Sequence, residues 1–252
     1  LQDIPKNINE EYSNEIIKAS NNSNLFEEVK VTFTNEKYII EVKEFPSINK
    51  LYFKNNERLD DDELEIIASN INFTTLNNQK INFFINETKK IYQSFGYNNI
   101  NIEYNKKIYK DSNTADIFFN INEGKITKIN KIIVNGNNSI SAQDIREIIK
   151  SRTKSITNIF ANNNYKPLTV ERDRFTIIDY YKNKGFLDVD IDTRIEYLKT
   201  NRVNIYFNIL EGNYYILSSV NIIDKQNILN SEASILILDT RDNFATDKKI
   251  FS

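Results

Sequence analysis

The chain has 252 residues, 40% of them hydrophobic, and a formal net charge of −2. It contains no cysteine and no histidine, which excludes disulfides, thiolate zinc sites, imidazole metal ligands and Ser-His catalysis. Lysines and acids are interleaved without a basic stripe, so nucleic acid is not an expected partner. The apolar runs, such as 234–238, are too short to span a bilayer as a helix. We therefore expect no enzyme, no cofactor and no metal site.

The first predicted elements are two strands with alternating hydrophobicity, in "NSNLFEEVKVTF" and "KYIIEVKE". Glu44 ends the second of them, and another short strand is predicted over 49–53. The alternation predicts two rows of side chains on a common inner face: Val29, Val31 and Phe33 from the first strand, and Tyr38, Ile40 and Val42 from the second.

A complete pattern of elements follows between residues 46 and 124. Acidic residues at 60–63 begin a predicted helix, where the helix dipole favours them, and their spacing does not match a calcium loop. A second helix ends at Gly96, as a left-handed C-terminal cap requires. Two alternating strands then end at Glu123-Gly124. The residues expected to face the core are Leu64, Ile67 and Ile71; Ile81, Phe84, Ile85 and Tyr92; Ile100, Ile102 and Tyr104; and Ile117, Phe119 and Ile121.

The same pattern returns between residues 125 and 212. A strand over 129–134 precedes a helix whose start, Ser141-x-x-Asp144, is typical of a capping box. The second helix ends at Gly185, and strands over 186–198 and 203–209 lead to Glu211-Gly212. A further strand is predicted over 217–223. The expected core residues are Ile145, Ile148 and Ile149; Ile177, Tyr180 and Tyr181; Leu187, Val189, Ile191, Ile195 and Tyr197; and Val203, Ile205, Phe207 and Ile209.

These patterns are copies of one repeated unit. The glycines that end the second helices lie 185 − 96 = 89 residues apart, and the closing glutamates lie 211 − 123 = 88 residues apart. Each unit reads β-α-α-β-β, which predicts an α+β fold with a three-stranded mixed sheet and both helices on one face.

The order of elements and the sequences of the repeats resemble POTRA domains, the polypeptide-transport-associated repeats of BamA-type assembly proteins. "VNGNNSISAQDI", "DYYKNKGFLDVDI" and "VNIYFNILEGNYY" carry the resemblance, and the long connection over 154–173 agrees with it. The first copy departs from the pattern, since Leu25-Phe26 replaces the glycine-aromatic pair. The resemblance implies four parts: the end of a first domain (1–45), a second domain (46–124), a third domain (125–212) and the start of a fourth (213–252).

The resemblance also implies a function. A POTRA arm lies in the periplasm, attached to the outer membrane through its own C-terminal β-barrel, which this sequence does not include. It scaffolds accessory lipoproteins and receives unfolded outer-membrane proteins. Two alternatives stay open: the arm of a related exporter of the two-partner secretion or translocation-and-assembly type, and a carboxylate-based enzyme, which would need acids converging in a pocket.

The first candidate binding site is the strand over 186–198, predicted to pair with only one neighbour. An extended client can add to such an edge by backbone hydrogen bonds. The residues expected to take part are Ile191, Asp192, Ile195, Tyr197 and Leu198. The alternative is an edge that Asp188, Asp190 and Asp192 protect against pairing.

Two further sets of residues are candidates. Ile39, Phe118 and Tyr206 each lie five residues before a closing glutamate, on the outer, helix-free face of the sheet. They offer partners an apolar contact, unless long neighbouring side chains cover them. The second set is an inter-domain hinge at the repeated junctions, formed by Glu123, Gly124, Glu211 and Gly212. The alternative is a tight turn that transmits no motion.

Overall fold

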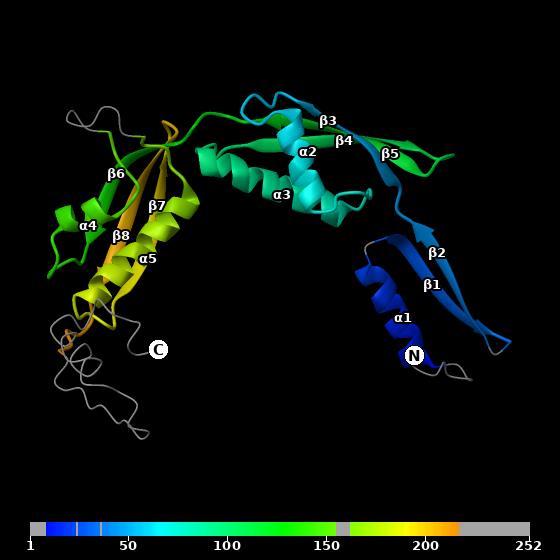
Figure 1. Ribbon diagram of the computed structural model, residues 1–252, viewed down its shortest axis with the longest axis horizontal. Helices are drawn as coiled ribbons and strands as arrows, with labels where there is room; N and C mark the ends of the chain where they lie inside the picture. The colour runs from blue at the N-terminus through cyan, green and yellow to red at the C-terminus, as the bar shows by residue number, and fades with distance from the viewer. Residues whose placement is uncertain (1–8, 24, 36, 155–161, 217–252) are drawn as a thin grey trace, which may run out of the picture. The chain divides into compact units, whose positions relative to one another are not determined.

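The computed structural model describes residues 9–23, 25–35, 37–154 and 162–216 (Figure 1). The strand expected over 217–223 and most of the expected fourth repeat lie outside the described residues. The chain divides into two compact units. The first contains residues 1–92 and 99–124, and the second contains residues 93–98 and 125–252.

The first unit begins with a helix and a hairpin. Helix α1 (Glu10–Asn22) precedes strands β1 (Phe26–Thr34) and β2 (Lys37–Glu44), which pair antiparallel. The predicted inner row of this hairpin is only partly covered: Ile40 is 47% exposed and Val42 is 45% exposed. The described part of this region consists of the two-stranded sheet and helix α1, which are too few elements to bury the inner row of side chains.

The remainder of the first unit has the predicted β-α-α-β-β order. It consists of β3 (Ser47–Lys54), α2 (Asp61–Asn70), α3 (Asn78–Phe95), β4 (Asn101–Tyr109) and β5 (Thr114–Asn122). The sheet order is β3-β5-β4, with β3 parallel and β4 antiparallel to β5. Helices α2 and α3 lie on one face of this sheet, as Figure 1 shows. The predicted mixed three-stranded sheet is confirmed.

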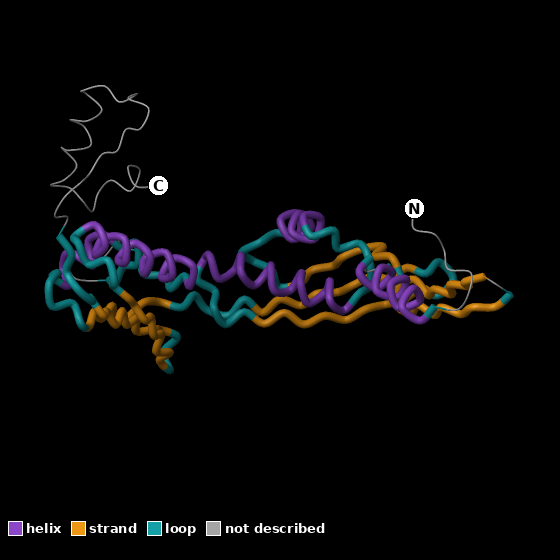
Figure 2. Tube along the Cα trace, turned by 90° about the horizontal axis from the view of Figure 1, so that it is seen from below, coloured by secondary structure: helices purple, strands orange, loops and turns teal. Residues whose placement is uncertain are grey.

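The second unit repeats this arrangement. It contains β6 (Lys128–Asn135), α4 (Ala142–Ile148), α5 (Pro167–Asn183), β7 (Asp190–Leu198) and β8 (Arg202–Leu210), with sheet order β6-β8-β7. Strand β6 is parallel to β8, and β7 is antiparallel to it. Figure 2 shows the helices in purple and the strands in orange. No helix among the described residues is long and apolar enough to cross a membrane.

The predicted helix ends are confirmed in detail. Asp60 caps α2 through a capping box with Glu63, which accounts for the acidic run at its start. The Ser141 side chain accepts a hydrogen bond from the Asp144 amide and caps α4. Gly96 and Gly185 have φ values of +104° and +98°, so each second helix is followed by a glycine in a conformation that other residues rarely adopt.

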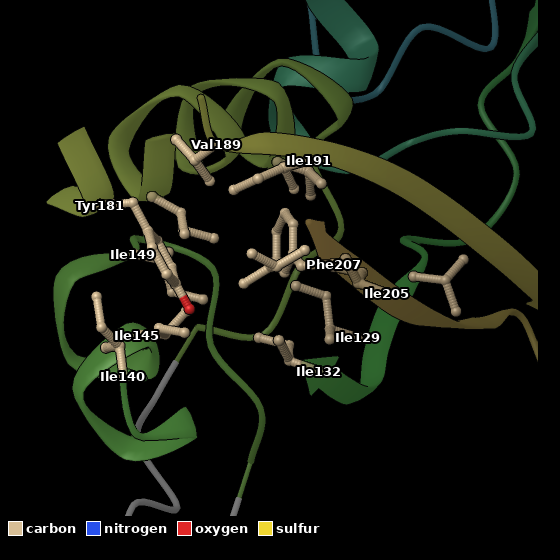
Figure 3. Close-up of a cluster of buried hydrophobic side chains, with 14 of the residues drawn as sticks. Ile129, Ile132, Ile140, Ile145, Ile149, Tyr181, Val189, Ile191, Ile205 and Phe207 are labelled. Carbon is tan, nitrogen blue, oxygen red and sulfur yellow. The ribbon is translucent and has the colours of Figure 1, made fainter. Parts of the chain in front are cut away.

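The core of the second unit lies between its sheet and its helices (Figure 3). Phe207 and Ile205 from β8 and Ile191 from β7 pack toward Ile145 of α4 and Tyr181 of α5, all at most 3% exposed. These residues were predicted from the 2-residue and 3.6-residue periodicities of their segments. Burying such large side chains supplies most of the stability of a small α+β unit.

One predicted strand differs from the structure. The segment expected to be extended over 186–198 becomes a strand only at Asp190, because Leu187 and Asp188 form a turn directly after Gly185. Leu187 is consequently 40% exposed and does not join the core. Tyr197 was also expected to face the core but is 65% exposed, at the end of the strand.

Candidate protein-interaction site

Strand β7 is an edge of its sheet. It pairs with β8 and with no other strand among the described residues. The opposite edge, β6, is partly closed at its start: the Ile129 amide donates to the Asn163 carbonyl (2.7 Å) and the Tyr165 amide donates to the Thr127 carbonyl (2.8 Å). The described part of the chain therefore leaves β7 as the more accessible edge of this sheet.

The free amides of β7 can be identified from one side-chain contact. The Ile191 amide donates to Oδ1 of the Asp190 side chain (2.9 Å). Because hydrogen-bonding residues alternate along an antiparallel strand, we infer that Thr193, Ile195 and Tyr197 point their amides toward the same open side. Asp190 thus covers the first amide of the edge, and the three amides that follow are on the side away from β8.

The predicted edge residues have different surroundings. Ile191 is buried, Asp192 is exposed, and Ile195 and Leu198 are half-buried. The exposed Tyr197 ring meets the buried Tyr165 ring edge-on, with 6.2 Å between the ring centroids. Ile195 and Tyr197 therefore lie in the part of β7 whose amides are inferred to face the open side.

The three aspartates proposed to protect the edge do not act alike. Asp188 precedes the strand and accepts a hydrogen bond from the Tyr215 hydroxyl (2.6 Å). Asp190 bonds to the adjacent amide of its own strand, as described above. Asp192 is exposed within the strand. Protection of the edge by charge therefore rests on Asp190 and Asp192.

The three apolar residues predicted on the outer sheet face also differ. Ile39 is 47% exposed. Phe118 stacks on Tyr52 of β3, with 4.7 Å between the ring centroids and an angle of 5°. Tyr206 donates its hydroxyl to Glu196 (2.7 Å) and lies beneath the Arg194 guanidinium, 3.9 Å from the ring centroid. Neighbouring side chains thus cover Tyr206 and one side of the Phe118 ring.

The closing glutamates are tied into their own units. Glu123 accepts hydrogen bonds from the Tyr92 hydroxyl (2.9 Å) and the Arg58 amide (2.7 Å). Glu211 accepts from the Tyr181 hydroxyl (3.0 Å) and from the amide and hydroxyl of Ser139. We did not predict this contact. The available signal was a tyrosine four residues before the helix-ending glycine in both complete repeats.

The contact between Glu211 and Tyr181 shifts the pKa of both residues. Burial by itself would raise the pKa of Glu211, but the hydrogen bonds from Ser139 and Tyr181 outweigh it, so this pKa lies below its ordinary value of 4.5. Burial raises the pKa of Tyr181, and its hydrogen bond to Glu211 adds to the effect. The pair is a charge-assisted hydrogen bond between the second helix and the end of the last strand.

The glycines after these glutamates have the conformation predicted for them. Gly124 and Gly212 have φ values of +69° and +70°. A Cβ atom on Gly212 would lie 2.8 Å from Cβ of Asp188, so space as well as φ favours glycine there. Three residues after Gly124, the Thr127 amide donates a hydrogen bond to the Gly96 carbonyl (2.9 Å). Three residues after Gly212, the Tyr215 amide donates in the same way to the Gly185 carbonyl (2.9 Å). Motion at these junctions stays a prediction.

Comparison with known proteins agrees with this architecture. The POTRA family model, described as "Surface antigen variable number repeat", matches residues 127–212. The outer membrane protein assembly factor BamA of Buchnera aphidicola subsp. Acyrthosiphon pisum is 25% identical over 229 residues, covering 87% of this chain and 37% of the relative. BamA of Neorickettsia risticii is 24% identical over 214 residues, covering 84% of this chain and 29% of the relative.

A solved structure of BamA POTRA3-5 from Haemophilus influenzae is also similar, with 14% identity and a TM-score of 0.46. The match covers 78% of this chain and 79% of that chain. The chain spans little more than a third of the length of the first curated relative. The family match identifies a POTRA domain at residues 127–212, and the chain is similar over most of its length to curated BamA proteins.

Proposed function

We propose that this chain is part of a periplasmic arm that serves outer-membrane protein assembly. In this role it scaffolds accessory lipoproteins and receives unfolded outer-membrane proteins, whose extended segments add to the sheet at β7. The curated relatives reported above are named as assembly factors, which supports this role over the exporter arm that the sequence left open.

The observation that carries the proposal is the edge position of β7. Its free side offers backbone amides at alternate residues, and backbone pairing is nearly independent of the client's sequence. That property suits a receiver of many different clients. The half-buried Ile195 and the exposed Tyr197 offer apolar contacts to the alternate side chains of an added strand.

The test is an amide NMR titration of the full chain with an extended amphipathic peptide from an outer-membrane β-barrel strand. We expect shifts concentrated in residues 190–198. Thr193→Pro removes one edge-facing amide without removing a hydrogen bond to β8, and proline is tolerated at such edge positions. This variant should weaken binding about tenfold or more, in line with the net value of one or two hydrogen bonds and the steric block.

Two controls make the test specific. Thr193→Val keeps the amide and the branched side chain, so it should bind like the unaltered chain. Peptides methylated on alternate backbone nitrogens should separate into one set that binds and one that does not, because only one row of amides faces β7. Equal binding by both methylated sets, or by Thr193→Pro with an intact β7-β8 pairing, would contradict strand addition.

A further inference from the structure

The helix-free face of the first unit's sheet carries an aromatic pair between lysines. Tyr52, on β3, and Phe118, on β5, are partners in the parallel register and stack face to face. Lys50 and Lys54 lie two residues before and after Tyr52, and Tyr52 is 37% exposed. The Lys50 ammonium lies 5.0 Å from the centroid of the Tyr52 ring. The side chains of β3 on the outer face are therefore a cation, an aromatic ring and a second cation, in that order.

A third lysine extends this surface across the sheet. Lys107 of β4 lies opposite Asp116 of β5, which in turn lies opposite Lys50. Asp116 is only 5% exposed and accepts hydrogen bonds from the Asn49 amide group (2.8 Å) and the Tyr109 hydroxyl (2.9 Å). The bond from Asn49 keeps the pKa of Asp116 below its ordinary value despite burial, and the bond from Tyr109 and the charges of Lys107 and Lys50 lower it further. This carboxylate is thus occupied within the sheet.

The lysines themselves are exposed to partners. Lys50, Lys54 and Lys107 are all exposed, and none of them belongs to the ion pairs of the described residues. The acid nearest to Lys54 across the sheet is Glu103, which accepts a hydrogen bond from Asn101 instead. The outer face therefore offers three cations around one aromatic pair.

The second unit shows that the repeat does not require this arrangement. At the register positions of Tyr52, Phe118 and Lys107, the second unit has Ile133, Tyr206 and Glu196. There the glutamate accepts hydrogen bonds from Tyr206 (2.7 Å) and Asn204 (2.8 Å), and Arg194 covers the ring. On the outer face of the second unit, the Glu196 carboxylate and the Tyr206 ring are thus paired with side chains of the same sheet. The corresponding face of the first unit has a cation where the acid would be.

We propose that this outer face of the first unit binds an extended acidic peptide in which an aromatic residue lies between two acidic residues at alternate positions. In an extended chain, alternate side chains lie on one face about 6.8 Å apart, which equals the spacing of Lys50, Tyr52 and Lys54 along β3. The peptide's ring extends the aromatic stack, and its carboxylates meet the two lysines. The surface is separate from the β7 edge and does not depend on strand addition.

The test uses the full chain and blocked threonine-based heptapeptides. The first carries aspartate, tyrosine and aspartate at alternate positions, the second has lysine in place of aspartate, and the third has the same composition with the two aspartates adjacent. NMR titration should give shifts at Tyr52, Phe118 and Lys107 with the first peptide. The second and third should bind at least about fivefold more weakly, as expected for lost exposed ion pairs. Binding of the first should also weaken with added salt.

Matched variants locate the site. Lys107→Glu copies the charge found in the second unit and should weaken binding about fivefold or more. Lys131→Glu makes the same change on the outer face of the second unit and should leave binding unchanged, as should Thr193→Pro. Equal binding of the aspartate and lysine peptides, equal loss with Lys131→Glu, or binding to phosphatidylglycerol vesicles with no binding of any peptide would each overturn the proposal.

Discussion

At the scale of single residues, the closing glutamates of the repeats have a structural role. Glu123 and Glu211 each accept a hydrogen bond from a tyrosine of the second helix and an amide of the loop before the first helix. One carboxylate therefore joins three segments that are far apart in sequence. In the segment before these two repeats, Asn21 stands four residues before Leu25, where the repeats have tyrosine before glycine.

Replacing Glu211 should therefore destabilise the second unit. We expect Glu211→Gln to lower the free energy of unfolding by about 1 kcal/mol at neutral pH, the approximate difference between a hydrogen bond to a charged acceptor and one to a neutral acceptor. The pKa of Glu211 is lowered in the folded state, so its stabilisation is present above the unfolded value and is lost as pH falls through the folded value. The difference between the two proteins should thus shrink in urea melts well below pH 4.5.

Glu44 provides a matched control for this prediction. It ends β2 at the corresponding position but is exposed. Glu44→Gln should change the unfolding free energy by less than about 0.5 kcal/mol, as is usual for surface substitutions. If both substitutions have the same effect, the contact of Glu211 with Tyr181 does not stabilise the fold.

At the scale of elements, the two edges of the second sheet are not equivalent. The start of β6 is occupied by backbone bonds from the segment before α5, whereas on the free side of β7 the contact found among the described residues is that of the Asp190 side chain. An edge strand without such cover is open to pairing with other chains. We therefore expect Asp190 to limit the proposed strand addition at β7.

Removal of this side chain should increase binding of an added strand. Asp190→Ala frees the Ile191 amide and should raise the affinity for the barrel-strand peptide about threefold to tenfold, as one further net hydrogen bond would. Asp192→Ala removes the same charge from the strand without freeing that amide. Isothermal titration of both variants separates the effects: an equal gain for both would mean that charge alone limits binding, whereas no gain for Asp190→Ala would mean that the amide is not used.

At the scale of the whole molecule, the division into units does not follow the order of the chain. Residues 93–98 at the end of α3 belong to the second unit, although the residues on both sides of them belong to the first. Within the second unit, the Asn98 side chain donates to the Tyr165 carbonyl (2.9 Å) and the Asn164 side chain donates to the Phe95 carbonyl (3.0 Å). These bonds attach the segment to the second core.

A core substitution should reveal this division. Phe207 is fully buried in the second unit, and Phe207→Ala should cost about 3–5 kcal/mol. Hydrogen exchange should then increase in residues 125–216 and also in 93–98, but not in 46–92. The reciprocal variant, Phe119→Ala in the first unit, should leave 93–98 protected. Exchange that rises equally throughout the chain in both variants would show a single cooperative unit instead.

Much of the architecture could be predicted from local patterns. Alternation identified Val203, Ile205 and Phe207 as one inner row of a strand, and the spacing of Ile81, Phe84 and Ile85 identified the buried face of a helix. Glycines marked the helix ends, because positive φ is a local property of the backbone. The edge position of β7 was expected from the resemblance to POTRA domains, and the structure places β7 at the edge of its sheet.

The candidate sites were less predictable, because exposure and pairing depend on residues distant in sequence. Alternation placed Tyr197 with Ile195, but it could not show that Tyr197 lies where it remains 65% exposed. It placed Phe118 and Tyr206 on the outer face, but only the pairing of β3 with β5 brings Tyr52 onto one ring, and only the pairing of β7 with β8 brings Arg194 onto the other. The sequence by itself determined the repeat, most of its elements and the face of most side chains, through local periodicity. The tertiary structure alone decided which faces are covered, because cover comes from neighbouring strands and helices.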